Sequence, residues 1–484
     1  MKAKRFLSML LALCLAVGMA FAAVIPASAA DALTDVLDYL AAQNTSPLFY
    51  SEWQVLALAR GGKTVPDTYL SEVLKAVKAG ELVSSTDYPR VVLALTAMGV
   101  DASDFAGYNL LESLADISFA TSPLPNGPIC ALLAFGCHSA YEAPAGYAQT
   151  LIDEVLNQRL PDGSWTYGWA VSVDPDMTSM ALQALAPYYD LRSDVKDAVD
   201  EAVVLLSNEQ QGSGGFGIDW GYGGGLEENA CSVAQVVTAL SILGIDAAAF
   251  TNGGDSALDA LLAYQNANGS FFSDWSAEDL MTTEQAAYAL VAYSRFKAGA
   301  NSLYDMTDVT LAAYVDTSAL NAKIAAVEGT AKGNYTDASW NAFQDALTAA
   351  QSAATQAQVD SALANLNTTF AGLTLKTDYT ALNAKINAVK DTGKGVYTDE
   401  SWELFRNALT AAQNVAKNTA ATQTEVNNAL SALTTAYNGL KELSRLQQWE
   451  LKLPAWLNCI KGLPDWLEWV VYYMFFGWIW DVVG

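Results

Sequence analysis

The sequence predicts an all-α protein made of consecutive helical parts. We expect an export signal (1–30), a repeat of helical hairpins (31–315), two three-helix bundles (316–377 and 378–444) and an aromatic tail (445–484). Three observations support this division. An Ala-Leu pair recurs at the spacing of a helical hairpin, one module of about sixty residues occurs twice, and six of the 13 tryptophans lie in the last forty residues.

The first thirty residues have the layout of a secretory signal peptide. Three basic residues among the first five precede an apolar run over 6–25, and small residues then form an A-x-A cleavage site. Cys14 lies inside the apolar run, whereas a lipoprotein signal places its cysteine at the end. We therefore expect a secreted protein, located at the cell surface or outside the cell.

Removal of that segment leaves a strongly acidic chain of 454 residues, long enough for about three domains. It takes away three of the 25 basic residues and none of the 52 acidic ones, so the net charge becomes about −30. Such a charge disfavours binding to nucleic acid.

The cysteines do not predict a disulfide framework. Cys130 and Cys137 are seven residues apart in an expected helix, so their Cα atoms would be about 10 Å apart, too far for a bridge. The other cysteines after residue 30 are Cys231 and Cys459.

The hairpin repeat is defined by Ala-Leu pairs, each inside a strongly apolar stretch. Their spacings of 37, 37, 53, 55 and 50 residues match one helical hairpin, so we expect six units. More amphipathic helices lie between them, as at 195–208 and 256–265. The pairs are Ala57-Leu58, Ala94-Leu95, Ala131-Leu132, Ala184-Leu185, Ala239-Leu240 and Ala289-Leu290.

A second repeated element connects the two kinds of helix. Residues 210–216 and 265–271 both read Q-x-x-x-G-x-F, and 158–165 is the same with one extra residue and a final Trp. The glycine permits a tight turn after an outer helix. The glutamine amide and the ring are expected to tie that turn to the next unit.

With these turns the region 31–308 resembles the α/α-toroid proteins of the squalene cyclase, protein prenyltransferase and cobalamin-carrier group. The stretches at 52–60, 108–112 and 302–306 are similar to a branch found in secreted and surface proteins of Gram-positive bacteria. The resemblance implies an α6/α6 toroid, in which six inner helices surround a central cavity and six outer helices surround them.

The duplicated module follows. Leu320, Tyr335 and Trp340 recur 62 residues later, and the second copy contains five extra residues. Each copy has three apolar stripes at helical spacing, enough for a three-helix bundle. The signature Gly-x-Tyr-Thr-Asp-x-Ser-Trp resembles FIVAR modules of bacterial surface and carbohydrate-active proteins, and this resemblance implies a stalk or a glycan contact.

The tail is aromatic and apolar. Twelve uncharged residues at 469–480 are too few for the ~20 that span a bilayer, and their aromatic content suits an interface. We expect residues 445–484 to dock on a membrane surface or a protein partner, or to pack on the chain's own bundles. Leu-Pro-Ala-Trp and Leu-Pro-Asp-Trp are not the L-P-x-T-G sorting signal.

One stretch, D-P-D-M-T-S from Asp174, lies close to the D-x-D-D-T-A acid motif of class II terpene cyclases. The resemblance would make Asp176, or Asp174, a proton donor, although Met177 replaces the last acid of the motif. The alternative is helix capping. Asp174, Asn229 and Asp279 each lie ten residues before an Ala-Leu pair, and all are favoured N-cap residues.

Other chemistries are weakly supported. The zinc ligands of protein prenyltransferases need a late histidine, yet the single histidine, His138, precedes Cys231. One histidine also provides a poor basis for a nucleophilic triad. Nothing singles out Glu227 and Glu228 as glycosidase carboxylates, and we ascribe them to a helix N-terminus.

The starts of the inner helices and their loops are expected to form one rim. Aromatic rings with a few carboxylates suit stacking on sugars or holding a ligand with an apolar, cationic group. The candidate ligand-binding residues are Glu52, Trp53, Trp165, Trp169, Trp220, Tyr222, Trp275 and Glu284.

The sequence thus favours a non-catalytic surface protein that binds an extracellular small molecule or a cell-wall or host glycan. A terpene-cyclase-like enzyme that uses Asp176 is the alternative, and a cobalamin carrier is a further one. We predict no metal site. We also predict no cofactor, because cobalamin carriers of that group usually add a β-rich domain that has no counterpart in this sequence.

Overall fold

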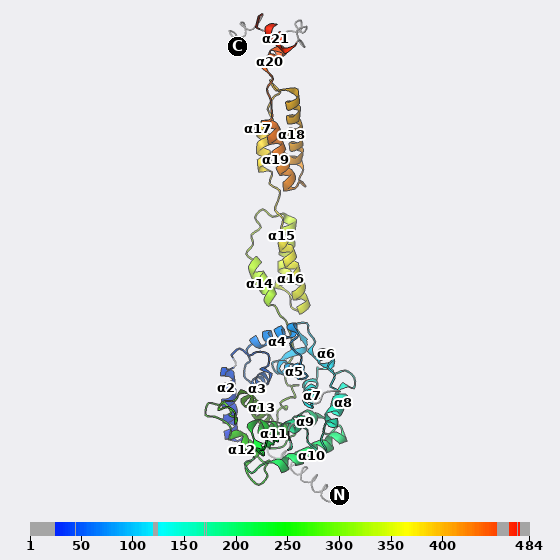
Figure 1. Cartoon of the computed structure of the whole chain (residues 1–484), viewed down its shortest axis with the longest axis vertical. Coiled ribbons are helices and arrows are strands. Elements are labelled where there is room, and N and C mark those ends of the chain that lie inside the picture. The colour runs from blue at the N-terminus through cyan, green and yellow to red at the C-terminus, as the bar shows by residue number, and fades with distance from the viewer. Residues whose placement is uncertain are drawn as a thin grey trace. The chain divides into compact units, whose positions relative to one another are not determined.

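The computed structural model describes residues 25–43, 45–119, 124–168, 170, 172–452, 464–471 and 473–474. This part of the chain is almost entirely helical, so the all-α prediction is confirmed (Figure 1). It folds into two compact units, one containing the helices up to Ala319 and the other most of the C-terminal helices. Most of the expected export signal lies outside the described residues.

Six inner helices form a closed ring in the first unit. Each packs against the next, and the last packs against the first. All six Ala-Leu pairs lie on these helices and are buried, which explains the repeat, since alanine lets neighbouring helices approach closely. The inner helices are α3 (Glu52–Arg60), α5 (Asp87–Ala97), α7 (Asn126–Gly136), α9 (Pro175–Leu185), α11 (Ala230–Ile242) and α13 (Leu280–Lys297).

Six outer helices surround the ring (Figure 1). They bury one apolar face each, as α8 does with Leu151, Ile152 and Val155. The α6/α6 toroid is therefore confirmed. The outer helices are α2 (Ala27–Gln43), α4 (Thr68–Ala79), α6 (Leu110–Ala115), α8 (Tyr147–Asn157), α10 (Ser193–Glu209) and α12 (Ala257–Leu262), and a 3-10 turn, η1 (Ala186–Tyr188), follows α9.

The Q-x-x-x-G-x-F turns join successive outer helices. Gln210 donates from Nε2 to the carbonyl of Phe250 at 2.9 Å, and Gln265 donates to the carbonyl of Ala32 in α2 at 2.9 Å. Gly269 has a φ of +88°, and a Cβ there would lie 2.3 Å from the carbonyl oxygen of Asp35. Only glycine permits both that dihedral angle and that approach. The last turn thus closes the outer ring on the first helix.

The segment after α13 seals one end of the toroid. Arg60, the last residue of α3, donates to the carbonyls of Leu303, Ser302 and Asp305 at 3.0, 2.8 and 2.9 Å, and pairs with Asp308 at 2.8 Å. Leu303 and Met306 are fully buried beneath it. We call residues 302–308 the plug.

Two pairs of short strands complete the described part of the toroid. β1 (Val100–Phe105) pairs in parallel with β4 (Ala312–Tyr314), next to the plug in sequence. β2 (Gly217–Ile218) and β3 (Glu227–Glu228) form an antiparallel hairpin whose loop, 219–226, precedes α11.

Each duplicated module has three helices. The first comprises α14 (Ser318–Val327), α15 (Asp337–Gln351) and α16 (Gln356–Ala371), and the second α17 (Thr380–Val389), α18 (Asp399–Lys417) and α19 (Gln423–Asn438). The middle helix has 15 residues in the first copy and 19 in the second, which accounts for most of the five-residue insertion.

The module signature has a structural role in both copies. Thr336 caps α15 by accepting from the backbone N–H of Ser339, and the Ser339 hydroxyl accepts from the N–H of Thr374 at 3.1 Å. Thr398 and Ser401 make the same contacts in the second copy, where Ser401 accepts from the N–H of Lys441 at 3.2 Å. The Thr-x-x-Ser part of the motif therefore ties the middle helix to the end of its own module.

In the tail, the structure describes α20 (Arg445–Lys452) and α21 (Asp465–Val471). Most of the apolar run at 469–480 lies outside the described residues. Among those described, none of the helices has the length and apolar character needed to span a bilayer.

Candidate ligand site

The beginnings of the inner helices lie together at the end of the toroid opposite the plug. Contacts between neighbours join them there. Glu52 of α3 pairs with Arg90 of α5 at 3.3 Å, and the thiol of Cys231 in α11 lies 3.4 Å from the hydroxyl of Thr282 in α13. We call this the open end.

Capping explains the start of α9. Asp174 is buried, and its Oδ1 accepts from the backbone N–H of Met177 at 2.9 Å. Asn229 and Asp279 accept in the same way from Ser232 and Thr282, so the predicted N-caps are confirmed. Burial raises the pKa of Asp174, and its hydrogen bonds oppose that shift.

Asp176 is the second residue of α9, in its first turn, and its surroundings differ from those of Asp174. Its Oδ1 is inaccessible to solvent and has no hydrogen-bond partner among the described residues. Burial raises its pKa to about 7, which the neighbouring Ser232 hydroxyl offsets only in part. Burial therefore favours the protonated form of Asp176.

The carboxyl group of Glu52, unlike that of Asp176, interacts with neighbouring protein groups through both of its oxygens. Its Oε1 accepts from the N–H of Tyr50 at 2.8 Å, and Arg90 lies beside Oε2. Tyr50 has a φ of +82°, a strained conformation for a residue with a side chain, and this hydrogen bond stabilises it. The carboxylate of Glu52 therefore fixes the loop before α3.

Glu284 and Trp53 lie nearby on α13 and α3. Burial raises the pKa of Glu284 to about 7, while Gln54 and Arg90 favour its charged form. The Trp53 ring is partly buried and lies 5.8 Å from that of Tyr288, centroid to centroid.

A chain of polar side chains crosses the toroid below them. Gln183 donates to Gln235 Oε1 at 2.9 Å, Gln235 donates to Gln285 Oε1 at 3.1 Å and to the Tyr288 hydroxyl at 2.5 Å, and Tyr304 of the plug donates to Gln183 at 3.3 Å. We call this set the glutamine ladder. Sequence reasoning missed it, although Gln235 and Gln285 each stand four residues before an Ala-Leu pair.

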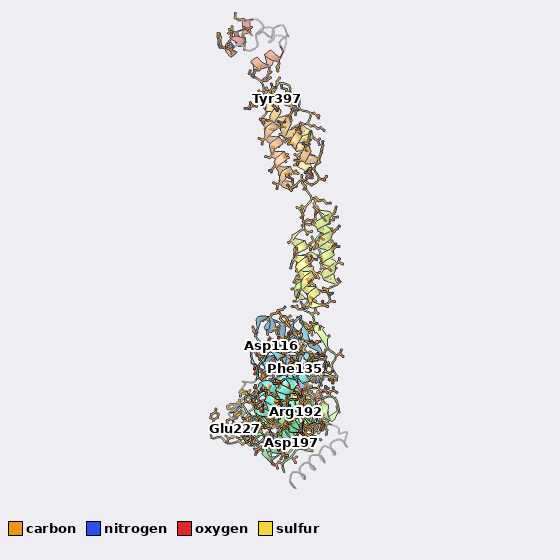
Figure 2. All side chains as sticks on the ribbon, turned by 90° about the vertical axis from the view of Figure 1, so that its right-hand side faces the viewer. Asp116, Phe135, Arg192, Asp197, Glu227 and Tyr397 are labelled. Carbon is orange, nitrogen blue, oxygen red and sulfur yellow. The ribbon has the colours of Figure 1, made fainter. Side chains whose placement is uncertain are left out.

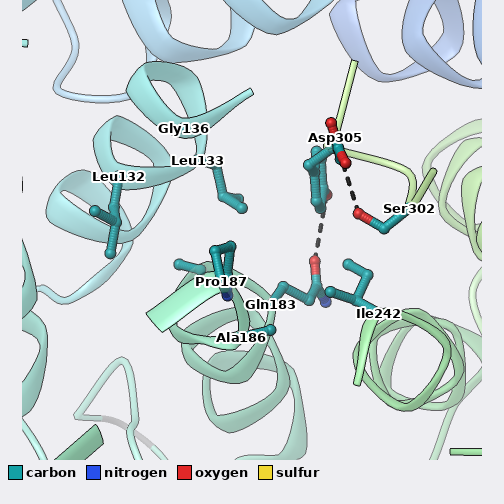
Figure 3. A pocket seen from close by; sticks show the side chains of 11 residues that line it. Leu132, Leu133, Gly136, Gln183, Ala186, Pro187, Ile242, Ser302 and Asp305 are labelled. Atoms are coloured by element: carbon teal, nitrogen blue, oxygen red, sulfur yellow. Dashed lines mark hydrogen bonds between the residues drawn. The ribbon is translucent and has the colours of Figure 1, made fainter. Parts of the chain in front are cut away.

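A cavity of about 370 Å³ lies at the closed end, where α7, α9 and α11 finish (Figure 3). Leu132, Leu133 and Ile242 give it apolar walls, and Gln183 and Asp305 supply polar groups. Gln183 of the ladder and Tyr304 of the plug both line this cavity.

A second cavity, of about 420 Å³, lies at the open end between the β2–β3 loop and the loop before α13. The Tyr222 and Trp275 side chains are 94% and 89% exposed, and Trp220 is half-buried beside them. Glu227 and Asp219 complete the polar lining. We call this the aromatic pocket, and Glu227 marks its side of the toroid in Figure 2.

Glycines shape the loop that presents these rings. Gly221, Gly223 and Gly225 have φ values of +77°, +84° and +79°, so the chain reverses repeatedly around Tyr222. Asp219 accepts from the N–H of Gly221 at 2.8 Å and fixes the first of these bends.

The predicted rim residues do not all lie in one place. Trp220, Tyr222 and Trp275 meet in the aromatic pocket, whereas Glu52, Trp53 and Glu284 lie on α3 and α13 and do not line it. Placing Trp165 on the rim was wrong. Its ring is fully buried and donates from Nε1 to the carbonyl of Val155 at 2.6 Å, because the final aromatic residue of the turn motif packs into the core. Trp169 lies outside the described residues.

The cysteines and the histidine form no reactive centre in the described part of the chain. Cys130, Cys137 and Cys231 are free, and burial raises the pKa of each thiol to about 12. His138 accepts from the N–H of Ala140 and lies 3.2 Å from the carbonyl of Val309. No cluster of three His, Cys, Asp or Glu side chains suited to a metal ion occurs among the described residues.

Comparison with known proteins gives partial matches. A zinc metalloprotease, ZmpB, of Streptococcus pneumoniae is 36% identical over 135 residues, covering 27% of this chain and 7% of that protein. A polysaccharide lyase 8 family protein, HylA, of Enterococcus faecalis is 35% identical over 137 residues, covering 26% and 10%. The chain thus spans a tenth or less of these relatives.

A solved structure, ent-copalyl diphosphate synthase from Streptomyces platensis, aligns with a TM-score of 0.32 and 19% identity over 54% of each chain. The family model of the FIVAR domain matches residues 316–374 and 378–441. The two C-terminal modules are therefore similar to FIVAR domains, as their signature predicts.

Proposed function

We propose that the chain is an exported cell-surface protein that binds an extracellular ligand, most simply a glycan, at the open end of its toroid. The observation that supports this best is the aromatic pocket, where Trp220, Tyr222 and Trp275 come together beside two carboxylates. Aromatic faces stack on sugar rings, and carboxylates accept from their hydroxyl groups.

The exposure of the rings supports a binding role. A solvent-exposed tryptophan and tyrosine on neighbouring loops contribute almost nothing to the core, while their apolar faces remain in water. Exposed apolar surface that is concentrated in one place marks an interaction site in soluble proteins.

The FIVAR-type modules and the relatives support the extracellular setting. One relative is named as a polysaccharide lyase and another as a metalloprotease, both from Gram-positive bacteria. We propose the two modules as a stalk or a second glycan contact, and residues 445–484 as the part that docks on a membrane surface or a partner.

The test is glycan binding by the chain from residue 31 onward. Cell-wall and host glycans would be screened on an array and hits measured by calorimetry. Trp275→Ala and Tyr222→Ala should each weaken binding at least tenfold, since stacked rings contribute strongly to small-ligand affinity. Tyr108→Ala, which removes an exposed tyrosine outside the pocket, is the matched control. Unchanged affinity in both pocket variants would refute the proposed site.

Acid catalysis by Asp176 is a second candidate because its buried Oδ1 is unpartnered and its pKa is raised to about 7. Such a group can donate a proton near neutral pH. Incubation with polyprenyl substrates and mass spectrometry of the products would test this, with Asp176→Asn abolishing turnover. No product from the unsubstituted chain would eliminate this candidate.

A further inference from the structure

The aromatic pocket lies in a part of the toroid that has no basic residues. From position 197 to position 294 the sequence has 14 Asp and Glu but no Lys, Arg or His. This stretch includes every side chain of the pocket. Basic residues from other segments reach Glu201 and Asp246 of this stretch, through Arg159 and Lys297. Among the described residues, none forms an ion pair with Asp219 or Glu227.

The lining of the pocket also contains few hydrogen-bond donors. Its side chains are three aromatic rings and two carboxylates, with glycines between them. Sites that read sugar hydroxyl groups usually combine acceptors with amide or guanidinium donors. Here the only side-chain donors are the two indole N–H groups and the phenol, so the pocket is poor in donors and rich in negative charge.

Rings and carboxylates together favour one class of ligand. The face of an aromatic ring is electronegative and attracts an ammonium group within about 6 Å, and the attraction is strongest for indole. Carboxylates add Coulomb attraction to the same group. Both components of the lining therefore select for positive charge, whereas a neutral sugar would use only stacking and hydrogen bonds to the carboxylates, without the Coulomb attraction.

We propose that the aromatic pocket binds the ammonium group of its ligand between Trp220, Tyr222 and Trp275, with Glu227 and Asp219 as counter-charges. This inference rests on the proposed function, because it specifies what the bound ligand contains. A quaternary ammonium substituent and the free amine of an amino sugar offer the same chemistry.

Isothermal calorimetry with matched probes tests the charge directly. Choline is compared with 3,3-dimethylbutan-1-ol, its neutral isostere, and glucosamine with N-acetylglucosamine. The cationic member of at least one pair should bind about fivefold tighter or more, and the preference should shrink at high salt. A preference in the choline pair identifies a quaternary ammonium, and one in the glucosamine pair identifies a primary amine.

Substitutions distinguish the contribution of the aromatic rings to binding from that of the carboxylate charge. Trp275→Ala should weaken binding of both members of a pair. Glu227→Gln, which keeps the shape, should reduce the preference for the cation while leaving the neutral member unaffected. Glu142→Gln, an exposed acid in the loop after α7, is the matched control.

The outcomes distinguish this inference from the proposed function. Equal binding of cationic and neutral probes, or tighter binding of N-acetylglucosamine, overturns the ammonium site while leaving a glycan-binding toroid. Binding of array glycans that is insensitive to Glu227→Gln also overturns it. If neither probes nor glycans bind, the proposed function fails as well.

Discussion

The two ends of the toroid differ in how they treat polar and apolar groups. At the closed end, Arg60 donates to three plug carbonyls and pairs with Asp308, and apolar plug residues are buried beneath it. At the open end, loops present apolar side chains to solvent. Of the large exposed hydrophobic residues described in the toroid, nine lie there: Leu48, Tyr50, Val83, Leu160, Tyr222, Leu226, Trp275, Leu280 and Met281.

This difference indicates where stability and binding reside. Fully hydrogen-bonded, buried groups fix a structure, while exposed apolar surface remains available for a partner. Substitutions at the closed end should therefore lower the free energy of unfolding most, and substitutions in the aromatic pocket should change ligand affinity. The predictions below test the stability part of this comparison, in order of decreasing effect.

The largest effect is expected for Arg60→Ala. It removes the hydrogen bonds from the guanidinium to the plug and leaves the buried Leu303 carbonyl and two partly buried carbonyls unpaired, so the free energy of unfolding should fall by about 3 kcal/mol. Urea denaturation followed by circular dichroism measures this. Lys75→Ala is the control, because its exposed pair with Glu72 contributes little. A comparable loss in the control would show that the plug has no special role.

Gln235→Leu should have the next largest effect. It cuts the glutamine ladder and leaves Gln183, Gln285 and the Tyr288 hydroxyl without their shared partner, at a cost of about 2 kcal/mol. The same denaturation experiment applies, with Gln149→Leu on the exposed surface of α8 as the control. A stability equal to that of the original chain would mean that the ladder is dispensable.

Asp174→Ala removes the N-cap of α9 and should lower the free energy of unfolding by about 1 kcal/mol. Asp174→Asn retains a capping oxygen, so it should lower the free energy of unfolding by only about a few tenths of a kcal/mol. Thermal melts of the two variants compare them. Equal destabilisation by Ala and Asn would show that the charge of Asp174, rather than its cap, matters.

The smallest effect concerns pH. Burial raises the pKa of Asp176 to about 7, so the folded chain binds a proton more tightly than the unfolded chain does. The stability from this group is complete below its unfolded pKa near 4 and is lost as pH rises through about 7. Between pH 6.5 and 8 the original chain should therefore lose up to about 1 kcal/mol of stability that Asp176→Asn does not lose. Parallel slopes for both chains would contradict the assigned pKa.

Much of the toroid could be predicted from local sequence. The Ala-Leu pairs mark all six inner helices because close helix packing needs small and apolar residues at fixed spacing. The caps at Asp174, Asn229 and Asp279 could also be predicted, since capping depends on residues within one turn.

The features that could not be predicted depend on contacts between residues far apart in the sequence. The plug is recognised only when Arg60 meets residues some 240 positions later. Trp165 looks like the rim tryptophans in sequence, yet packing buries it, whereas Trp275 at a loop tip stays exposed. Composition alone does not distinguish these two environments.

The bond from Gln265 to the Ala32 carbonyl spans 233 residues and has a consequence for biogenesis. Besides α3, the helix α2 packs against α12 and α13, which leave the ribosome only after the rest of the ring. Closing so long a loop adds little to the entropic cost but delays the final step of folding. The toroid can therefore close only after the residues through α13 have been synthesised, and until then α2 lacks most of the packing that it has in the folded chain.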